Sequence, residues 1–352
     1  MIKFSRTLIP QFFIIVLLFN TVFTQNKENS IHGYVFDKST GEPLENVNVY
    51  LTNSTWGSST DRDGYYSIRQ IPQGAHELVV SIIGYEYATN KINLKDGTRL
   101  NFNFSLNPVI YETETTRVEG LIPTEWLKDL EFFKVYFLGQ TDFAEDCFIE
   151  NSEVLDFTKP NDSIFKASAI KPLVITNRAL GYHIDCILVS FIFDKSSNSC
   201  EWFVLPKFTE LKPKDNEELT KWIENRFEAF EGSRYHFLRS FCSKRLREER
   251  FDIYKVAKSG QRVPRADWHP LLIDYDDYIE KTTHSEDTIL HFEKFLHVVY
   301  KNHYVSWIGL NYPYITLDEF GYAYENRSYR VNGEWAKHGI ADLLPKDFKS
   351  KK

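Results

Sequence analysis

Residues 100–106, Leu-Asn-Phe-Asn-Phe-Ser-Leu, alternate apolar and polar side chains at every step. This alternation is typical of a β-strand with one buried face, because successive side chains of a strand point to opposite faces of the sheet. Similar short runs occur upstream at residues 31–36, 47–51, 65–68 and 77–83. Turn-forming sequences separate these runs, and no helical pattern occurs between them. Residues 29–107 therefore predict a small antiparallel β-sandwich of about seven strands.

Three stretches of this region also share their order and spacing with a known domain. They are IHGYVFDKSTGEPLENVNVYL at residues 31–51, SSTDRDGYYSI at residues 58–68 and IPQGAHELVVSIIGYE at residues 71–86. Together they resemble the carboxypeptidase regulatory-like domain, a transthyretin-like β-sandwich that is common in envelope proteins of Bacteroidetes. The resemblance implies a fold and a cellular neighbourhood, and it implies no activity.

The resemblance raises two functions that the residues exclude. A TonB-dependent receptor barrel of around 22 strands, at ~10 residues a strand, needs more chain than the about 245 residues after the sandwich. A zinc carboxypeptidase of the kind that carries this domain needs a His-x-x-Glu pair plus a distant histidine. None of the ten histidines is followed by Glu three residues later. We therefore expect neither a receptor barrel nor a zinc carboxypeptidase.

The start of the chain has the features of a secretory signal peptide. Lys3 and Arg6 precede an apolar stretch at residues 8–23, and Thr24 marks a cleavage position. The stretch is shorter than the ~20 apolar residues of a membrane span, although an uncleaved anchor is the alternative. We expect residues 1–24 to be removed, leaving a periplasmic or envelope protein without a transmembrane span. Removing the two basic residues lowers the formal net charge from −7 to −9, which argues against nucleic acid as a partner.

The four cysteines, Cys147, Cys186, Cys200 and Cys242, contain no Cys-x-x-Cys pair. Their spacing predicts no zinc knuckle, and both disulfides and buried thiols remain open for an exported protein. The turn at residues 61–64, Asp-Arg-Asp-Gly, lacks the distal Glu of a calcium loop, so it predicts a hairpin turn and no metal site.

A polar linker at residues 108–120 separates the sandwich from a second domain at residues 121–345, and a basic tail at residues 346–352 ends the chain. The second domain mixes helical and strand patterns, in an order that favours an α+β domain. Strands are expected at residues 173–176, 183–193, 201–208, 251–256 and 289–300.

Three helices are expected in this second domain. The first runs from the Pro123-Thr124 cap to Gly139. A capping box of Asp215 and Glu218 begins the second, whose apolar stripe is Leu219, Trp222, Ile223, Phe227 and Phe230. Ser233 caps the third, which is expected to continue to about Arg247. The segments 147–155, 232–239 and 343–345 resemble the uncharacterised C-terminal region of short secreted Bacteroidetes proteins, which implies an architecture and no catalytic residue.

The third helix carries the candidate binding residues, His236 and Arg239. With Ser240, Ser243 and Arg247 they fall at i, i+3, i+4, i+7 and i+11, so one helix face would present a row of donors. Such a row could bind a carboxylate, a phosphate or sugar hydroxyls, and a solvated polar face is the alternative. His291 and His297 would share a strand but lie ~20 Å apart, too far for one metal ion.

No sequence motif identifies a catalytic residue, a metal site or a cofactor. The chain has no Gly-x-Ser-x-Gly elbow, phosphate-binding glycine loop or nicotinamide fingerprint. We expect a secreted, non-catalytic envelope protein whose sandwich is an interaction module and whose α+β domain binds a protein or glycan partner. The alternative is a hydrolase of unfamiliar type that acts on an envelope glycan or peptide.

Overall fold

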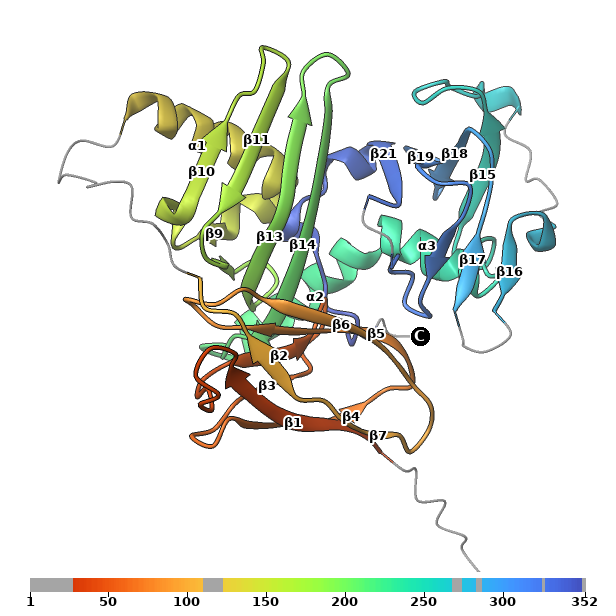
Figure 1. The fold of residues 1–352 in the computed structure, drawn as a ribbon. Helices are drawn as coiled ribbons and strands as arrows, with labels where there is room; N and C mark the ends of the chain where they lie inside the picture. The colour runs from red at the N-terminus through yellow and green to blue at the C-terminus, as the bar shows by residue number, and fades with distance from the viewer. Residues whose placement is uncertain (1–27, 110–122, 268–273, 283–286, 325–326, 350–352) are drawn as a thin grey trace, which may run out of the picture.

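The computed structural model describes residues 28–109, 123–267, 274–282, 287–324 and 327–349. The predicted signal peptide at residues 1–24 and most of the predicted linker at residues 108–120 lie outside these ranges. Figure 1 shows three groups of strands: the sandwich at the bottom, a middle sheet at the upper left and two C-terminal sheets at the upper right. None of the helices in the described ranges is both long enough and apolar enough to cross a membrane.

The N-terminal strands form the expected β-sandwich. Its strands are β1 (Asn29–Asp37), β2 (Asn48–Leu51), β3 (Gly57–Ser59), β4 (Tyr65–Ile71), β5 (Gly74–Ser81), β6 (Ala88–Leu94), β7 (Arg99–Asn101) and β8 (Phe104–Leu106). One sheet has the order β4-β1-β7, with β8 also paired to β1, and the other has the order β3-β2-β5-β6. The alternating apolar residues meet between the sheets, where Ile31, Val49 and Leu78 are fully buried. The prediction of an N-terminal sandwich is confirmed.

The sandwich departs from the sequence prediction at its last strand. Residues 100–106 form two short strands, and both pair with β1 in parallel. The break lies where the backbone of Phe102 passes over Gly33, since a Cβ on Gly33 would lie 1.8 Å from the Phe102 carbonyl oxygen. There the Tyr34 N–H donates to the Asn103 side chain at 2.9 Å instead of to a backbone carbonyl. The close approach at a glycine therefore divides one predicted strand into two.

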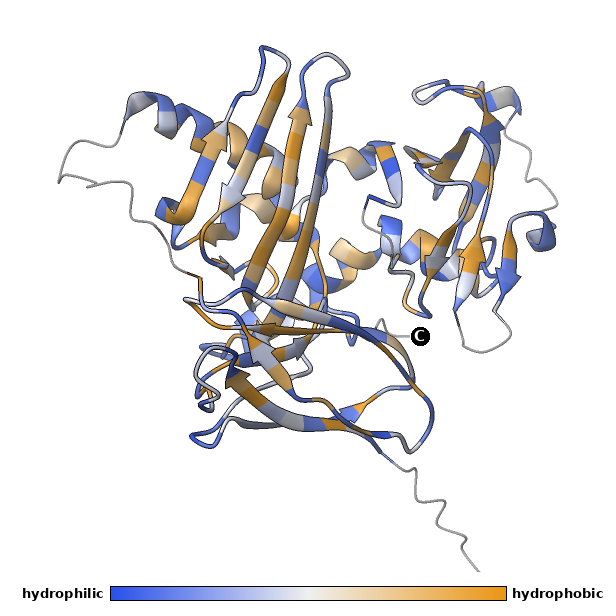
Figure 2. Cartoon of the chain, viewed as in Figure 1, coloured by the Kyte–Doolittle hydropathy of each residue, from blue (hydrophilic) through white to orange (hydrophobic). Residues whose placement is uncertain are grey.

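The middle sheet has six strands and is covered by α1 (Figure 1). Its elements are α1 (Thr124–Phe137), β9 (Cys147–Ile149), β10 (Leu155–Thr158), β11 (Ile164–Ala169), β12 (Leu173–Asn177), β13 (Tyr182–Asp194), β14 (Ser199–Glu210) and α2 (Asn216–Phe230). β13 has 13 residues, long enough to pair with β12 and β11 along one edge and with β14 along the other. Figure 2 shows hydrophobic and hydrophilic residues alternating along these strands. The hydrophobic side contacts α1 through Phe133 and Phe137, which are fully buried.

The two predicted helices of this part form where they were expected, with differences in detail. No side chain caps α1, in which Thr124 is the first helical residue. Asp215 caps α2 by accepting the Glu218 N–H at 2.8 Å. The apolar stripe predicted for α2 is partly wrong, because Leu219 and Ile223 are exposed. The buried face of α2 instead centres on Trp222, Arg226 and Ala229, since Arg226 donates to the carbonyls of the turn before β13.

The C-terminal part has one helix and two small sheets. Its elements are α3 (Arg234–Cys242), β15 (Phe251–Val256), β16 (Ile279–Lys281), β17 (Thr288–Leu290), β18 (Phe295–Tyr300), β19 (Tyr304–Leu310), β20 (Ile315–Leu317) and β21 (Tyr329–Gly333). The sheets have the orders β15-β18-β19-β21 and β16-β17-β20, and their core includes Phe237 and Phe241 of α3. Short 3-10 helices occur at Asp142–Asp146, Ser152–Val154, Arg265–Asp267, Tyr275–Asp277, Glu334–Lys337 and Ile340–Asp342. An α+β region thus follows the sandwich, as predicted.

Two predictions for the C-terminal part are wrong. The helix α3 ends at Cys242 and not near Arg247, because the chain turns at Ser243 and Lys244 takes a positive φ of 58°. The single strand predicted over residues 289–300 is two strands, β17 and β18, which belong to different sheets. His291 and His297 therefore do not share a strand.

The sandwich packs against the middle sheet. Tyr50 and Val79, on the outer face of the β3-β2-β5-β6 sheet, contact Ile187 and Leu205. The Tyr50 hydroxyl donates to the Leu205 carbonyl at 2.9 Å. The loop after β2 also forms two backbone hydrogen bonds with β14. The Asn53 N–H donates to the Pro206 carbonyl, and the Phe208 N–H donates to the Ser54 carbonyl. The sandwich is therefore joined to the α+β region by apolar contacts and by hydrogen bonds.

The last described residues join all three parts. The Lys346 N–H donates to the Asn53 carbonyl at 2.7 Å, and Asp347 accepts from Thr55. The ammonium of Lys346 pairs with the Asp318 carboxylate at 2.5 Å, and both side chains are almost fully buried. Lys346 belongs to the segment predicted as a basic tail, but in the structure its side chain is buried and helps to hold the parts of the chain together.

Candidate functional site

His236 lies in an aromatic cluster beneath the surface. The Ser233 side chain caps α3 by accepting the His236 N–H at 3.1 Å, which fixes the start of the helix. The His236 ring packs against Phe230, Phe251 and Tyr300, with centroid distances of 4.7, 4.9 and 5.8 Å. Only 6% of the residue is exposed. A ligand in solvent would therefore reach little of this side chain.

The protonation state of His236 follows from its contacts. Its Nδ1 accepts the Gly232 N–H at 3.0 Å, so the ring proton belongs on Nε2, which faces Glu249 Oε2 at 3.4 Å. Burial lowers the pKa of His236, and Glu249 acts in the opposite direction. His236 is therefore a neutral ring that joins the turn before α3 to Glu249.

Arg239 lies at a small cavity and not in the aromatic cluster of His236. It is half-buried and lines a cavity of about 30 Å³, which holds about one water molecule. The other lining residues come from the end of α2, the start of α3, the segment after β20 and the C-terminal segment from residue 342: Ala229, Phe230, Ser233, Tyr235, Phe320, Tyr322, Asp342, Leu344, Pro345, Lys346 and Phe348. Burial raises the pKa of Asp342, one of these residues, to about 6. His236 does not line the cavity, so the structure does not bring the two predicted binding residues to one site.

The predicted donor row on α3 does not form one exposed face. The Ser240 hydroxyl is buried and donates to the His236 carbonyl at 2.6 Å. The Ser243 hydroxyl donates to the Arg239 carbonyl at 2.7 Å, at the end of the helix. Arg247 lies beyond the helix. The row was wrong because the helix is shorter than the sequence suggested and because two of its donors bond to the helix backbone.

The other polar candidates have structural contacts. Asp61 Oδ1 accepts the N–H groups of Asp63 and Tyr65, and Gly64 takes a φ of 75°, as in the predicted tight turn. His297 packs between the rings of Tyr254 and Trp307. No group of three or more His, Cys, Asp or Glu side chains within the described ranges could hold a metal ion. The four cysteines are free thiols, of which Cys147, Cys186 and Cys242 are buried.

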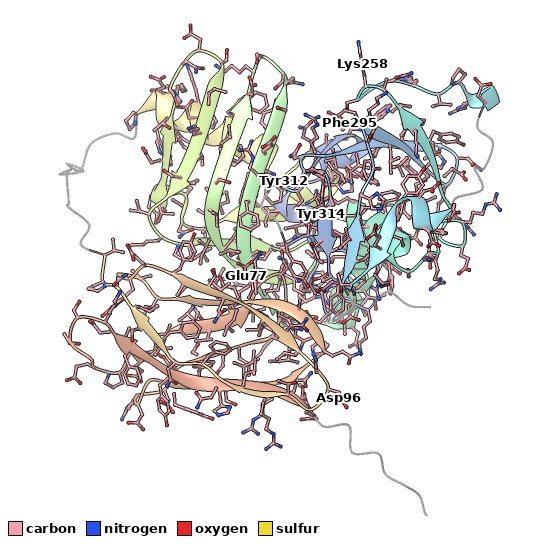
Figure 3. All side chains as sticks on the ribbon, turned by 45° about the vertical axis from the view of Figure 1, so that its right-hand side comes forward. Glu77, Asp96, Lys258, Phe295, Tyr312 and Tyr314 are labelled. Carbon is pink, nitrogen blue, oxygen red and sulfur yellow. The ribbon has the colours of Figure 1, made fainter. Side chains whose placement is uncertain are left out.

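A pair of exposed tyrosines escaped the sequence reasoning. Tyr312 and Tyr314, here called the tyrosine pair, are 47% and 56% exposed in the turn between β19 and β20. Asn311 holds this turn, because its N–H donates to the Ser328 carbonyl at 3.0 Å and its side chain donates to the Arg327 carbonyl at 2.8 Å. Arg327 in turn forms an ion pair with Glu201 of β14. The tyrosine pair therefore projects from a fixed turn beside the middle sheet (Figure 3).

The signal for this pair was present in the sequence. Residues 311–314 read Asn-Tyr-Pro-Tyr, a turn sequence that carries two aromatic side chains on either side of a proline. Short turn sequences of this kind are common, and only the structure shows that both residues are about half exposed.

Comparisons with known proteins concern the sandwich. The family model of the CarboxypepD_reg-like domain matches residues 31–118. No curated protein matches this chain.

Solved structures match parts of the chain. Catechol 1,2-dioxygenase from Acinetobacter sp. ADP1 is 16% identical, with 26% of this chain and 56% of that chain covered and a TM-score of 0.20. The 5-hydroxyisourate hydrolase of Klebsiella pneumoniae is 18% identical, with 23% and 91% covered and a TM-score of 0.20. The backbone protein of group B streptococcus pilus 2b is 20% identical, with 22% and 40% covered and a TM-score of 0.20. This chain spans less than two thirds of the length of the first dioxygenase that it matches.

The sandwich seen in the structure and the family match coincide. The two sheets of β1 to β8 occupy residues 29–106, within or next to the matched residues. The chain thus contains a CarboxypepD_reg-like domain at residues 31–118.

Proposed function

We propose that this protein is an exported, non-catalytic envelope protein that binds a protein or glycan partner through the tyrosine pair. The signal-peptide pattern of residues 1–24 supports export to the periplasm or envelope. The CarboxypepD_reg-like domain supports the same neighbourhood, as in the Bacteroidetes envelope proteins that the sequence resembles. In this reading the sandwich is an interaction module that is packed against the part of the chain that contacts the partner.

The exposure of Tyr312 and Tyr314 carries the proposal. The two residues are about half exposed, so a partner that covers them removes apolar ring surface from water, which favours binding. Their hydroxyls can form hydrogen bonds with the partner. The Asn311 hydrogen bonds hold the turn in place before binding, so little conformational entropy is lost on association. Because tyrosine is enriched among the residues that dominate protein interfaces, a protein partner is favoured over a glycan.

A capture experiment with matched variants tests this proposal. Wild-type protein, a Tyr312→Ser/Tyr314→Ser variant and a Tyr34→Ser/Tyr87→Ser control are immobilised and exposed to envelope extract from the producing cells. Tyr34 and Tyr87 are 41% and 44% exposed on the sandwich, so the control removes similar aromatic surface elsewhere. Proteins retained by the wild type are identified and purified, and a panel of purified envelope glycans is titrated in parallel.

The expected result is a partner whose affinity falls by about tenfold or more in the Tyr312/Tyr314 variant and stays unchanged in the control. Equal affinities of the wild type and the Tyr312/Tyr314 variant would contradict the role of the pair. Loss of binding in the control alone would place the contact on the sandwich. Turnover of an envelope glycan or peptide by the purified protein would contradict the non-catalytic function.

A further inference from the structure

A groove in the C-terminal part is lined mainly by basic side chains. It has a volume of about 430 Å³ and is lined by Arg247, Arg250, Phe251, Asp252, Lys301 and Asn302, which together are here called the basic groove. Two segments form it: the turns after α3 that lead into β15, and the turn between β18 and β19. They are joined because the Lys301 N–H donates to the Arg250 carbonyl at 3.1 Å. The groove is therefore a feature of the folded chain, built from residues about fifty positions apart.

The charges of the groove are only partly balanced. Three of its side chains are basic and one, Asp252, is acidic, although the whole chain has a formal charge of −7. Lys301 pairs with Glu231 at 2.5 Å, outside the lining. Arg247 and Arg250 are exposed, and neither guanidinium makes a hydrogen bond or salt bridge to any residue that the structure describes.

The neighbouring Arg245 shows the contrast. Its guanidinium contacts Glu248 at 2.6 Å and Glu249 at 3.0 Å, so its charge is neutralised within the turn. Within the groove, burial raises the pKa of Asp252 and Arg247 acts in the opposite direction, so Asp252 lies near that guanidinium. Arg247 and Arg250 nevertheless form no ion pair with a described residue. The donors of these two arginines remain available to a ligand.

Two of the basic residues of the groove, Arg250 and Lys301, have backbone conformations that favour Gly or Asn. Arg250, Lys301 and Asn302 have φ values of 65°, 48° and 63°. Lys301 and Asn302 are the central residues of a turn in which the His303 N–H donates to the Tyr300 carbonyl, and Asn-Gly is the preferred pair in such turns. Gly or Asn would adopt these conformations at lower cost than Arg or Lys. The ion pair with Glu231 accounts for a lysine at position 301, whereas no ion pair with a described residue accounts for an arginine at position 250. A ligand would supply that reason.

The geometry points to a binding site for a phosphate or sulfate group carried by a larger molecule, such as a modified sugar. Guanidinium groups donate paired hydrogen bonds that match the oxygen atoms of these anions, and the groove offers two of them, Arg247 and Arg250, whereas the Lys301 ammonium is already paired with Glu231. The volume lies in the range of roughly 300–1,000 Å³ that is usual for small-molecule pockets, so it exceeds what one free ion would fill. This inference is independent of the tyrosine pair and of the partner proposed for it.

Sugar esters test the site directly. The full-length mature protein is titrated with glucose 6-phosphate, glucose 6-sulfate, glucose and inorganic phosphate, and binding is followed by calorimetry or by ligand-observed NMR. The groove variant is Arg247→Gln/Arg250→Asn, in which Asn tolerates the positive φ of position 250. The control is Arg69→Gln/Arg99→Gln, which removes the same charge from exposed positions on the sandwich. Thermal melting is measured for all three proteins.

We expect at least one of the two esters to bind the wild type more tightly than inorganic phosphate does, and glucose not to bind. The groove variant should bind that ester about tenfold or more weakly, while the control binds as the wild type does. Neither variant should melt at a lower temperature than the wild type, since Asn relieves the positive φ at position 250. Preference for one ester would identify the anion. Absence of ester binding by the wild type, equal binding by the groove variant, or equal weakening in the control would overturn the site. Equal affinities for an ester and for inorganic phosphate would overturn the larger ligand.

Discussion

Replacing Lys346 by Met should destabilise the protein strongly, although the sequence places this residue in a basic tail. The Lys346 and Asp318 side chains are 5% and 2% exposed, and the Lys346 ammonium is also 5.0 Å from the Tyr322 ring centroid. Lys346→Met would leave the Asp318 carboxylate buried without its counter-charge. Removing one partner of a buried pair costs about 3–5 kcal/mol, so we expect the free energy of unfolding to fall by that amount.

Urea unfolding, followed by far-UV circular dichroism and tryptophan fluorescence, measures this change. The matched control is Lys134→Met, since the Lys134 ammonium pairs with the Glu131 carboxylate at 2.8 Å on the surface. These two side chains are 34% and 71% exposed. The control should lose about 0–1 kcal/mol. A double variant, Lys346→Met/Asp318→Asn, should recover part of the loss because no buried charge remains unpaired. A loss below about 1 kcal/mol for Lys346→Met would refute the assignment of this pair as a buried junction.

Three further predictions concern a buried histidine, a glycine and the thiols. Burial and the nearby Lys346 lower the pKa of His76 from its ordinary 6.5 to about 4, so between these values the unfolded chain binds more protons and stability rises with pH. On going from pH 7 to pH 5, the free energy of unfolding measured in urea should therefore fall by about 1–2 kcal/mol more for the wild type than for His76→Gln. Equal decreases in the two proteins would contradict this. Gly181→Ala should lower the free energy of unfolding by about 1–3 kcal/mol, because Gly181 has a φ of 71° and a Cβ there would lie 2.3 Å from the Trp222 ring, whereas an unchanged urea midpoint would show that the ring can move away. Because the four cysteines are free thiols, alkylation in denaturant without a reductant should modify all four by mass spectrometry, and a smaller number would mean that a disulfide has formed.

Local sequence signals predicted the elements that local contacts determine. The start of α2 follows from Asp215 accepting a hydrogen bond from a residue three positions on, and the start of α3 follows from Ser233 in the same way. Alternation located β1, β2, β4 and β5 of the sandwich because one face of each strand must be buried, whereas it did not indicate β3 or β6. These features depend on residues that are close in the sequence, so the sequence alone contains the necessary information.

Apart from the early end of α3, which is a local turn at Lys244, the main failures involve contacts between distant segments. The division of residues 100–106 depends on Gly33, and the burial of Lys346 depends on Asp318. His236 was predicted on an exposed face, but it is covered by Phe251 and Tyr300, which come from β15 and β18. The basic groove likewise combines two turns that no local pattern relates. A sequence pattern can assign a residue to a helix, but which face is buried depends on the elements that pack against it.

Photo-crosslinking in the producing cells tests the central claim of partner binding most directly. A photoreactive phenylalanine analogue replaces Tyr314 in one strain and the exposed Tyr87 of the sandwich in another. We predict a discrete crosslinked adduct from position 314, absent from position 87 and lost when Tyr312→Ser is added. Adducts from position 87 alone, or no adduct from either position together with no glycan binding in titration, would contradict the claim that the tyrosine pair contacts a partner.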